Sequence, residues 1–123
     1  MSVIKPVLRI FDYNKTIEFY VDWLGFKIDW MHEFEPGTTP KFMQASFRDI
    51  ILFLSEHHGD GSPGIRITID ELKGLKEYHQ QLIDKKYKYN RPGLEIPEWD
   101  PEYITMTVID PVGNKITFTE KVK

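Results

Sequence analysis

Two aromatic residues, Phe34 and Trp99, lie where the sequence shows no core periodicity, and acidic residues flank both of them. Glu33 and Glu35 border the first ring, and Asp100 follows the second. Aromatic faces attract cations, and nearby carboxylates add to that attraction, so such a set suits a flat cationic ligand. A tryptophan in a loop is either docked on the protein or available to a ligand, and in the second case these rings and carboxylates would serve a flat cation.

Other residue types that could carry catalysis are poorly arranged for it. The chain has no cysteine, which excludes thiol catalysis, disulfides and zinc–thiolate sites. The glycine-rich stretch 59–64 lacks the lysine of a phosphate-binding loop and precedes a predicted strand, not a helix. No Gly-x-Ser-x-Gly elbow is present, and the carboxylates of 98–102 are more typical of a solvated loop than of acid–base catalysis. We expect no catalytic residue, and no metal on the histidines, which are His32, His57, His58 and His79.

Length and charge narrow the possible classes of protein. The chain has 123 residues, which fits one domain. Its formal charge of −3 argues against a nucleic-acid partner, because proteins of that class are more often basic. No apolar run approaches the ~20 residues that cross a bilayer, and the N-terminus shows no signal-peptide pattern. We expect a cytoplasmic protein with neither a membrane nor a nucleic-acid partner.

Hydrophobic periodicity predicts the elements that must position these residues. Helical spacing predicts helices over 17–24 and 72–83, with Asp12 or Asn14 as the first N-cap, Asp70 as the second, and Gly25 ending the first helix. Apolar alternation and turn signals predict strands over 4–10, 26–33, 42–47, 50–54, 65–69, 87–90, 103–109 and 115–120.

The predicted order β-α-β-β-β occurs twice, which indicates an internal duplication. Arg9 and Arg66 sit on matching faces of the two opening strands, which supports the repeat. We predict an α+β fold of one domain over 1–123, in which modules 1–58 and 64–123 are joined by linker 59–63. Together the two modules would form a cupped mixed sheet.

Four motifs carry a resemblance to a known family over essentially the whole chain. They are Phe19-Tyr20 with Leu24-Gly25-Phe26, Leu52 to His57 with Gly59 to Gly64, Arg91-Pro92-Gly93-Leu94-Glu95, and Val108 to Asn114. With them the chain resembles the vicinal-oxygen-chelate superfamily of glyoxalases, extradiol dioxygenases and bleomycin resistance proteins. The second and third motifs resemble the bleomycin-resistance branch.

The resemblance implies where a metal would bind in the enzymes and where a drug would bind in the resistance proteins. The four metal positions correspond here to Lys5, Phe53, Gly64 and Thr117, which are unsuited to a divalent cation, so no metal or other cofactor is expected. In bleomycin resistance proteins, aromatic rings sandwich the drug, and Phe34 and Trp99 lie in the matching regions. The resemblance therefore implies that these two rings form opposite walls of a ligand cleft. The remaining predicted ligand contacts are Trp30, Phe53, Arg9 and Arg66, and the two arginines leave open an anionic group deeper in the cup.

The sequence and the resemblance suggest three functions, of which the first is favoured. The first is non-catalytic binding and sequestration of a bleomycin-type glycopeptide antibiotic or a similar aromatic cation, conferring antibiotic resistance. The second is a glyoxalase-fold enzyme, a lyase, isomerase or dioxygenase, acting on a small molecule. The third is a ligand-binding domain unconnected with antibiotics. The resemblance also implies a homodimer, often with exchanged N-terminal arms.

Overall fold

The computed structural model describes residues 2–33 and 40–122. The chain forms two compact units, Met1–Ile65 with Pro111–Asn114, and Arg66–Asp110 with Lys115–Lys123. Each unit has its own sheet, and each sheet mixes parallel and antiparallel pairs. The predicted α+β fold is therefore confirmed.

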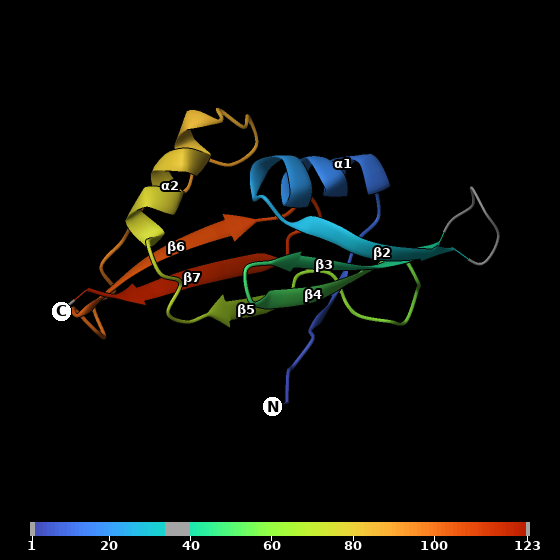
Figure 1. Cartoon of the computed structure of the whole chain (residues 1–123), viewed down its shortest axis with the longest axis horizontal. Helices are drawn as coiled ribbons and strands as arrows, with labels where there is room; N and C mark the ends of the chain where they lie inside the picture. Colours follow the sequence, from blue (N-terminus) through green and yellow to red (C-terminus); the bar gives the residue numbers. More distant parts are fainter. Residues whose placement is uncertain (1, 34–39, 123) are drawn as a thin grey trace. The chain divides into compact units, whose positions relative to one another are not determined.

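The first unit is a four-stranded sheet with one helical segment against it (Figure 1). The strands lie in the order β1-β4-β3-β2, where β1 pairs parallel with β4 and the other pairs are antiparallel. The strands are β1 (Val7–Arg9), β2 (Lys27–Glu33), β3 (Lys41–Phe47) and β4 (Ile50–Ser55), and the helical segment is α1 (Tyr13–Ile17), continued by the π-helical η1 (Glu18–Trp23).

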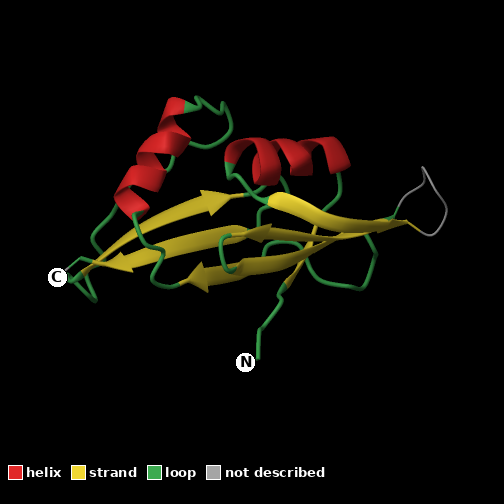
Figure 2. Ribbon diagram, viewed as in Figure 1, coloured by secondary structure: helices red, strands yellow, loops and turns green. Residues whose placement is uncertain are grey.

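The second unit is a three-stranded sheet in the order β5-β7-β6, with one helix packed on it (Figure 2). β5 (Arg66–Ile69) pairs parallel with β7 (Lys115–Lys121), and β7 pairs antiparallel with β6 (Tyr103–Ile109). The helix is α2 (Leu75–Asp84). Within residues 2–33 and 40–122, no helix has the length and apolar character that a membrane span requires.

The strand predicted over 87–90 does not form. Residues 88 and 89 make a turn, and the side chain of Asn90 replaces the missing strand at the edge of β6. Its Nδ2 donates to the Ile109 carbonyl at 2.8 Å, and its Oδ1 accepts from the Ile109 amide at 3.0 Å. One amide side chain thus makes the two hydrogen bonds that a paired backbone residue would supply.

The helix termini confirm one predicted cap and correct another. Asp12 Oδ1 accepts from the Lys15 amide at 3.0 Å, as an N-cap does, and Gly25 ends the first helix at φ +93°. The prediction of Asp70 as the second N-cap is wrong. Its Oδ1 accepts instead from Thr119 Oγ1, and α2 begins only after Gly74.

A distant carboxylate satisfies the N-terminus of α2. The two oxygens of Glu120, on β7, accept from the amides of Gly74 at 3.1 Å and Leu75 at 3.0 Å. This carboxylate satisfies orphan amides and offsets the positive end of the helix dipole. The start of α2 is therefore set by its sheet partner and not by a local capping residue.

Each unit buries one face of its sheet under its helix. In the first unit the core residues include Leu8, Phe19, Tyr20, Leu24, Met43, Leu52 and Leu54. In the second unit they include Leu75, Tyr78, Leu82, Met106, Val108, Ile116 and Phe118. The opposite face of the first sheet carries Trp30, Phe42 and Phe53.

Candidate functional site

The uncovered face of the first sheet carries three aromatic rings in mutual contact, on neighbouring strands. Trp30 on β2 stacks on Phe42 of β3 with centroids 5.8 Å apart and an interplanar angle of 26°. Phe53 on β4 lies 5.1 Å from the Phe42 ring and 5.9 Å from the Trp30 ring. Trp30 remains 43% exposed, so the cluster presents an aromatic face to solvent.

A β-bulge in β2 puts Trp30 on this face. Ile28 pairs with Ala45 on the core side, and two residues later Trp30 would point the same way in a regular strand. The register instead shifts between Ile28 and Trp30, so that Trp30 pairs with Gln44 on the uncovered side. The extra residue is Asp29, and a one-residue shift reverses the face of everything that follows it.

Polar side chains link the aromatic cluster to the bulge. Lys5 Nζ donates to Gln44 Oε1 at 3.1 Å, and Gln44 Nε2 donates to Asp29 Oδ2 at 3.0 Å. Ser46 Oγ donates to Asp29 Oδ1 at 2.9 Å, and Lys27 Nζ lies 3.7 Å from the same oxygen. The hydrogen bond from Gln44, and then those from Ser46 and Lys27, hold the pKa of Asp29 below its ordinary value. Asp29 is therefore a fixed negative charge beside Trp30.

Two cations also lie on this face. Lys5 Nζ lies 5.3 Å from the centroid of the Phe53 ring. Arg9, on β1, pairs in register with Ser55, and its guanidinium lies 4.8 Å from the Phe11 ring centroid. The face thus has the Asp29 carboxylate on its β2 side and the Arg9 guanidinium on its β1 side, while Lys5 reaches over Phe53 to the Gln44 side chain that also bonds Asp29.

The other acidic residues predicted in the first half of the site are placed differently. Glu33 comes three residues after Trp30 and pairs with Lys41, whose Nζ lies over the Tyr13 ring of α1, 5.3 Å from its centroid. Its side chain therefore projects from the helix-covered side of β2, opposite the Trp30 ring. Phe34 and Glu35 lie outside the described residues.

The remaining predicted residues belong to the second unit. Trp99 is 77% exposed in the loop before β6. Asp100 organises that loop, because its Oδ1 accepts from the Glu102 amide at 3.2 Å and its carbonyl from the Tyr103 amide at 3.3 Å. Arg66 is exposed on β5 and pairs in register with Lys115.

The residues at the four metal positions implied by the resemblance do not fit a divalent cation. Lys5 is itself a cation and contacts Phe53, Gly64 has no side chain, and the Thr117 hydroxyl is hydrogen-bonded to Thr107 at 2.9 Å. This set offers neither an imidazole nor a carboxylate. Within residues 2–33 and 40–122, no three histidine or acidic side chains gather as a metal site would require.

Sequence reasoning missed Phe42, Gln44 and Asp29 as parts of this face. The alternation of β3 could have indicated the first two, since Phe42 and Gln44 point away from Met43 and Ala45, which are buried. Nothing in the local sequence marks Asp29 as a bulge, because a bulge is defined by the partner strand.

Comparisons with known proteins agree with the fold. The chain resembles the crystal structure of a bleomycin-binding protein complexed with bleomycin, at 21% identity and a TM-score of 0.73, covering 98% of this chain and 99% of that one. A bleomycin resistance determinant encoded on transposon Tn5 gives 20% identity, a TM-score of 0.73 and 98% coverage of both chains. A protein described as a glyoxalase family member, from Bacillus anthracis, gives 18% identity, a TM-score of 0.69 and coverage of 98% and 96%.

The sequence comparison gives the family. A search of curated protein sequences found no match to the chain. Residues 1–123 match the family described as glyoxalase superfamily protein, which spans the whole sequence. The chain therefore belongs to the glyoxalase superfamily.

Proposed function

We propose that this protein binds and sequesters, without catalysis, a flat aromatic cation such as a bleomycin-type antibiotic, and so confers resistance to it. The observation that carries the proposal is the contact of Trp30, Phe42 and Phe53 on an uncovered sheet face. Stacked aromatic pairs add about 0.5–1.5 kcal/mol beyond the burial of their area. A planar ligand laid on this cluster would gain such contacts from a preformed surface, with little ordering cost.

The charges on this face suggest how the ligand would be oriented. Asp29 lies beside Trp30 and attracts a positive group, whereas Arg9, on β1, favours a carbonyl or anionic group at the opposite side of the sheet, and Lys5 lies between them over Phe53. A ligand with a cationic end, a flat centre and a hydrogen-bond-accepting end would match all three regions. The exposed Trp99 is proposed as a further ring contact, together with Phe34 and the carboxylates of Glu35 and Asp100.

Calorimetric titration with metal-free bleomycin tests the proposal. We expect Trp30→Ala and Phe42→Ala each to weaken binding by about tenfold, because ~1.4 kcal/mol corresponds to a factor of ten. Tyr89→Ala is the matched control, since Tyr89 is also an exposed ring, at 62%, but lies outside this face. Unchanged affinity in both cluster variants would remove the aromatic face from the site. The absence of binding by the unaltered protein would exclude bleomycin as the ligand.

An enzyme of the same superfamily is the competing function, because glyoxalase family members share this fold. The donor set described above argues against the metal-dependent chemistries, since no predicted ligand position holds an imidazole or a carboxylate. Stoichiometric metal in the purified protein is the observation that would favour the enzyme.

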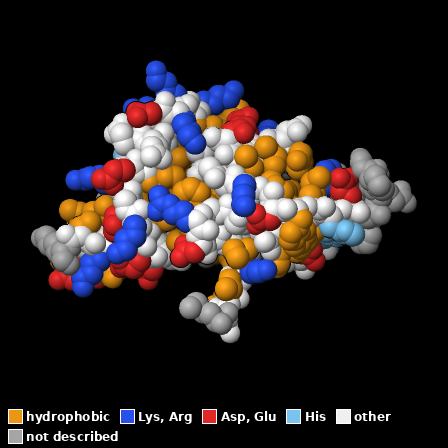
Figure 3. Space-filling model, viewed as in Figure 1, with side chains coloured by type: hydrophobic (Ala, Val, Ile, Leu, Met, Phe, Trp, Pro, Cys, Tyr) orange, Lys and Arg blue, Asp and Glu red, His pale blue; other side chains and the backbone are white. Residues whose placement is uncertain are grey.

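We also propose that the protein acts in the cytoplasm as a homodimer with exchanged N-terminal arms. Before β1 the chain carries two exposed apolar side chains, Val3 at 57% and Ile4 at 89%. Exposed apolar side chains also occur among charged ones on the face drawn in Figure 3. Apolar groups of this kind gain free energy when a second subunit covers them.

A further inference from the structure

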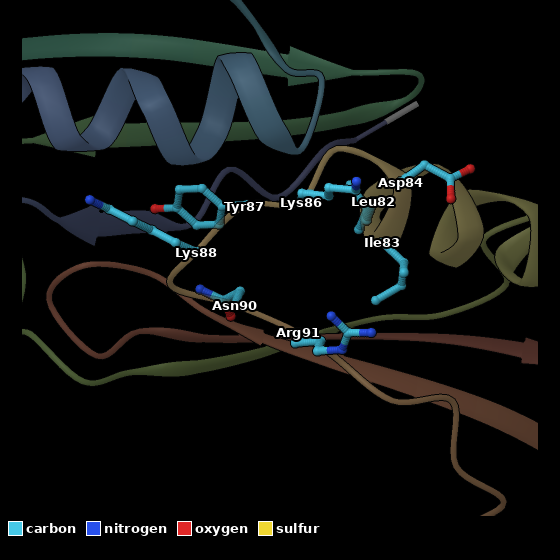
Figure 4. Close-up of a pocket in the computed structure, with 8 residues that line it drawn as sticks. All are labelled: Leu82, Ile83, Asp84, Lys86, Tyr87, Lys88, Asn90 and Arg91. Carbon is cyan, nitrogen blue, oxygen red and sulfur yellow. The ribbon is translucent and has the colours of Figure 1, made fainter.

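A hollow, distant in sequence from the aromatic face, lies where α2 ends in the second unit. Its volume is about 450 Å³, within the range that small ligands occupy. Leu82, Ile83 and Asp84 reach it from α2, and the loop after the helix supplies the rest of the wall (Figure 4). Asn90 fixes this loop through its two hydrogen bonds to Ile109 on β6.

The wall of the hollow is basic although the chain is acidic. Figure 4 shows Lys86 and Arg91 on opposite sides of it, whereas Lys88 extends away from it, with its ammonium 5.0 Å from the Tyr89 ring centroid. Among the described residues, no ion pair neutralises any of these three cations. The one carboxylate of the wall, Asp84, is already held by Gln80, whose Nε2 donates to its Oδ1 at 2.9 Å. Asp84 keeps its negative charge in that hydrogen bond, but the basic residues of the wall outnumber it, so the wall carries a net positive charge that an anion could meet.

Helix capping does not account for these cations. The carbonyls of the last turn of α2 accept from backbone amides: Gln81 and Leu82 from Lys85 at 3.3 Å, and Ile83 from Lys86 at 3.1 Å. These hydrogen bonds satisfy groups that a basic side chain would otherwise serve. Lys88 and Arg91 lie beyond the last turn, where the dipole of the helix has largely decayed.

The backbone at Lys86 gives an independent reason to assign its side chain a role. Lys86 adopts φ +53° directly after the C-cap Lys85, a position where glycine is the usual residue. A residue with a Cβ is strained there, and such strain persists only where the surrounding structure enforces it, as it often does at ligand sites. The strained position places a lysine at the wall of the hollow.

We propose that this hollow binds a small organic anion, a phosphate or carboxylate attached to a flat or apolar group. Lys86 and Arg91 would hold the charged group, since guanidinium and ammonium groups form charge-assisted hydrogen bonds to such oxygens. Ile83 and the ring of Tyr87 would contact the apolar part. This site is separate from the proposed antibiotic-binding face, and neither depends on the other.

The test titrates the full chain with phenyl phosphate, benzoate, inorganic phosphate and benzyl alcohol. Binding is monitored through the NMR chemical shifts of the backbone amides. We expect shifts confined to residues 82–91 and the adjoining Ile109, and binding by phenyl phosphate or benzoate several-fold tighter than by inorganic phosphate. The tighter of the two organic anions identifies the preferred head group. Arg91→Gln should weaken binding of the preferred organic anion by about tenfold. Lys76→Gln, on α2 but outside the hollow, should leave that binding unchanged.

Lys86→Gly separates binding from folding. Glycine relieves the positive φ, so this variant should melt at a higher temperature and yet bind the organic anion several-fold more weakly. Three results would overturn the proposal. These are shifts scattered over the surface, equal binding of benzyl alcohol, and phosphate binding as tightly as the organic anions, which would mean an adventitious ion only. Unaltered binding in both Arg91→Gln and Lys86→Gly would also overturn it.

Discussion

Lys5 and Phe53 lie in direct contact, with the ammonium nitrogen 5.3 Å from the centroid of the ring. The resemblance to metal-binding relatives aligns both residues with ligand positions, so a cation–π pair stands where two ligands would be needed. A cation over an aromatic face contributes about 0.5–1 kcal/mol at an exposed site. The Lys5 ammonium also repels a second cation placed beside it.

The first prediction follows from this pair. The protein, expressed with added Ni²⁺, Zn²⁺ and Fe²⁺ and then dialysed, should retain far less than one equivalent of any metal. The physical reason is that an amine, a phenyl ring and a hydroxyl do not replace carboxylate or imidazole ligands. Elemental analysis by plasma mass spectrometry measures this directly. About one ion per chain would contradict the prediction and favour the enzyme.

The second prediction concerns the stability of the protein at acidic pH. The pKa of Asp29 is lowered in the folded protein, chiefly by the hydrogen bond from Gln44. Its stabilising effect is therefore present above the unfolded value of 3.8 and is lost as the pH falls through the lower folded value. Urea unfolding at pH 7 and at successive values below 4 should show a smaller acid-induced loss of stability for Asp29→Asn than for the unaltered protein. An identical loss in both proteins would contradict the prediction.

The third prediction concerns Asn114, which is fully buried. Its Oδ1 accepts from the amides of Gly64 at 2.9 Å and Ile65 at 3.1 Å, and its Nδ2 donates to the Arg9 carbonyl at 3.0 Å. Asn114→Ala leaves three backbone groups without these partners, and each buried unsatisfied group costs about 1–3 kcal/mol. We expect a loss of about 3 kcal/mol in the free energy of unfolding, measured by urea denaturation.

Asn14→Ala is the control for this loss. Asn14 is exposed on α1, so its truncation should change the free energy of unfolding by less than about 0.5 kcal/mol. If both variants unfold at the same urea concentration as the unaltered protein, the hydrogen bonds of Asn114 do not stabilise the first unit.

Local patterns predicted most of the fold because local chemistry determines those elements. The hairpin of β3 and β4 is an example, since apolar alternation on both sides of Arg48 and Asp49 defines the strands and the turn. Asp12 and Gly25 likewise act on their own helix. Where the partner lies far away in sequence, the pattern failed: Asp70 bonds to Thr119, and Glu120 satisfies the helix start that Asp70 was predicted to cap.

The candidate site was predictable only in part for the same reason. Phe53 and Trp30 could be named from the sequence, but the face on which Trp30 lies depends on the bulge at Asp29. A bulge exists only relative to the register of the paired strand, so one strand's sequence does not reveal it. The same shift sends Glu33 to the helix-covered side, opposite Trp30.

The fourth prediction concerns assembly. Light scattering at micromolar concentration should give twice the chain mass of 14.6 kDa. Ile4→Ser should shift the equilibrium toward the monomer, because Ile4 is 89% exposed within one chain and would be covered in an arm-exchanged dimer. Ser2→Ala, in the same arm, removes a hydroxyl group and no apolar area, and serves as the control. A mass near 14.6 kDa for the unaltered protein would exclude the dimer.

The last prediction concerns Trp99, which is 77% exposed in the loop before β6. A side chain this exposed contributes little to folding, so Trp99→Ala should leave the melting temperature nearly unchanged. If Trp99 contacts the ligand as proposed, the same variant should weaken binding of metal-free bleomycin by about tenfold, the loss of ~1.4 kcal/mol of stacking. Trp99→Phe should restore much of the affinity, because a ring remains. A large fall in melting temperature would mean that Trp99 stabilises the fold. Unchanged affinity would show that this loop does not contact the ligand, whereas the role of the aromatic face of the first sheet is tested separately by the Trp30 and Phe42 variants.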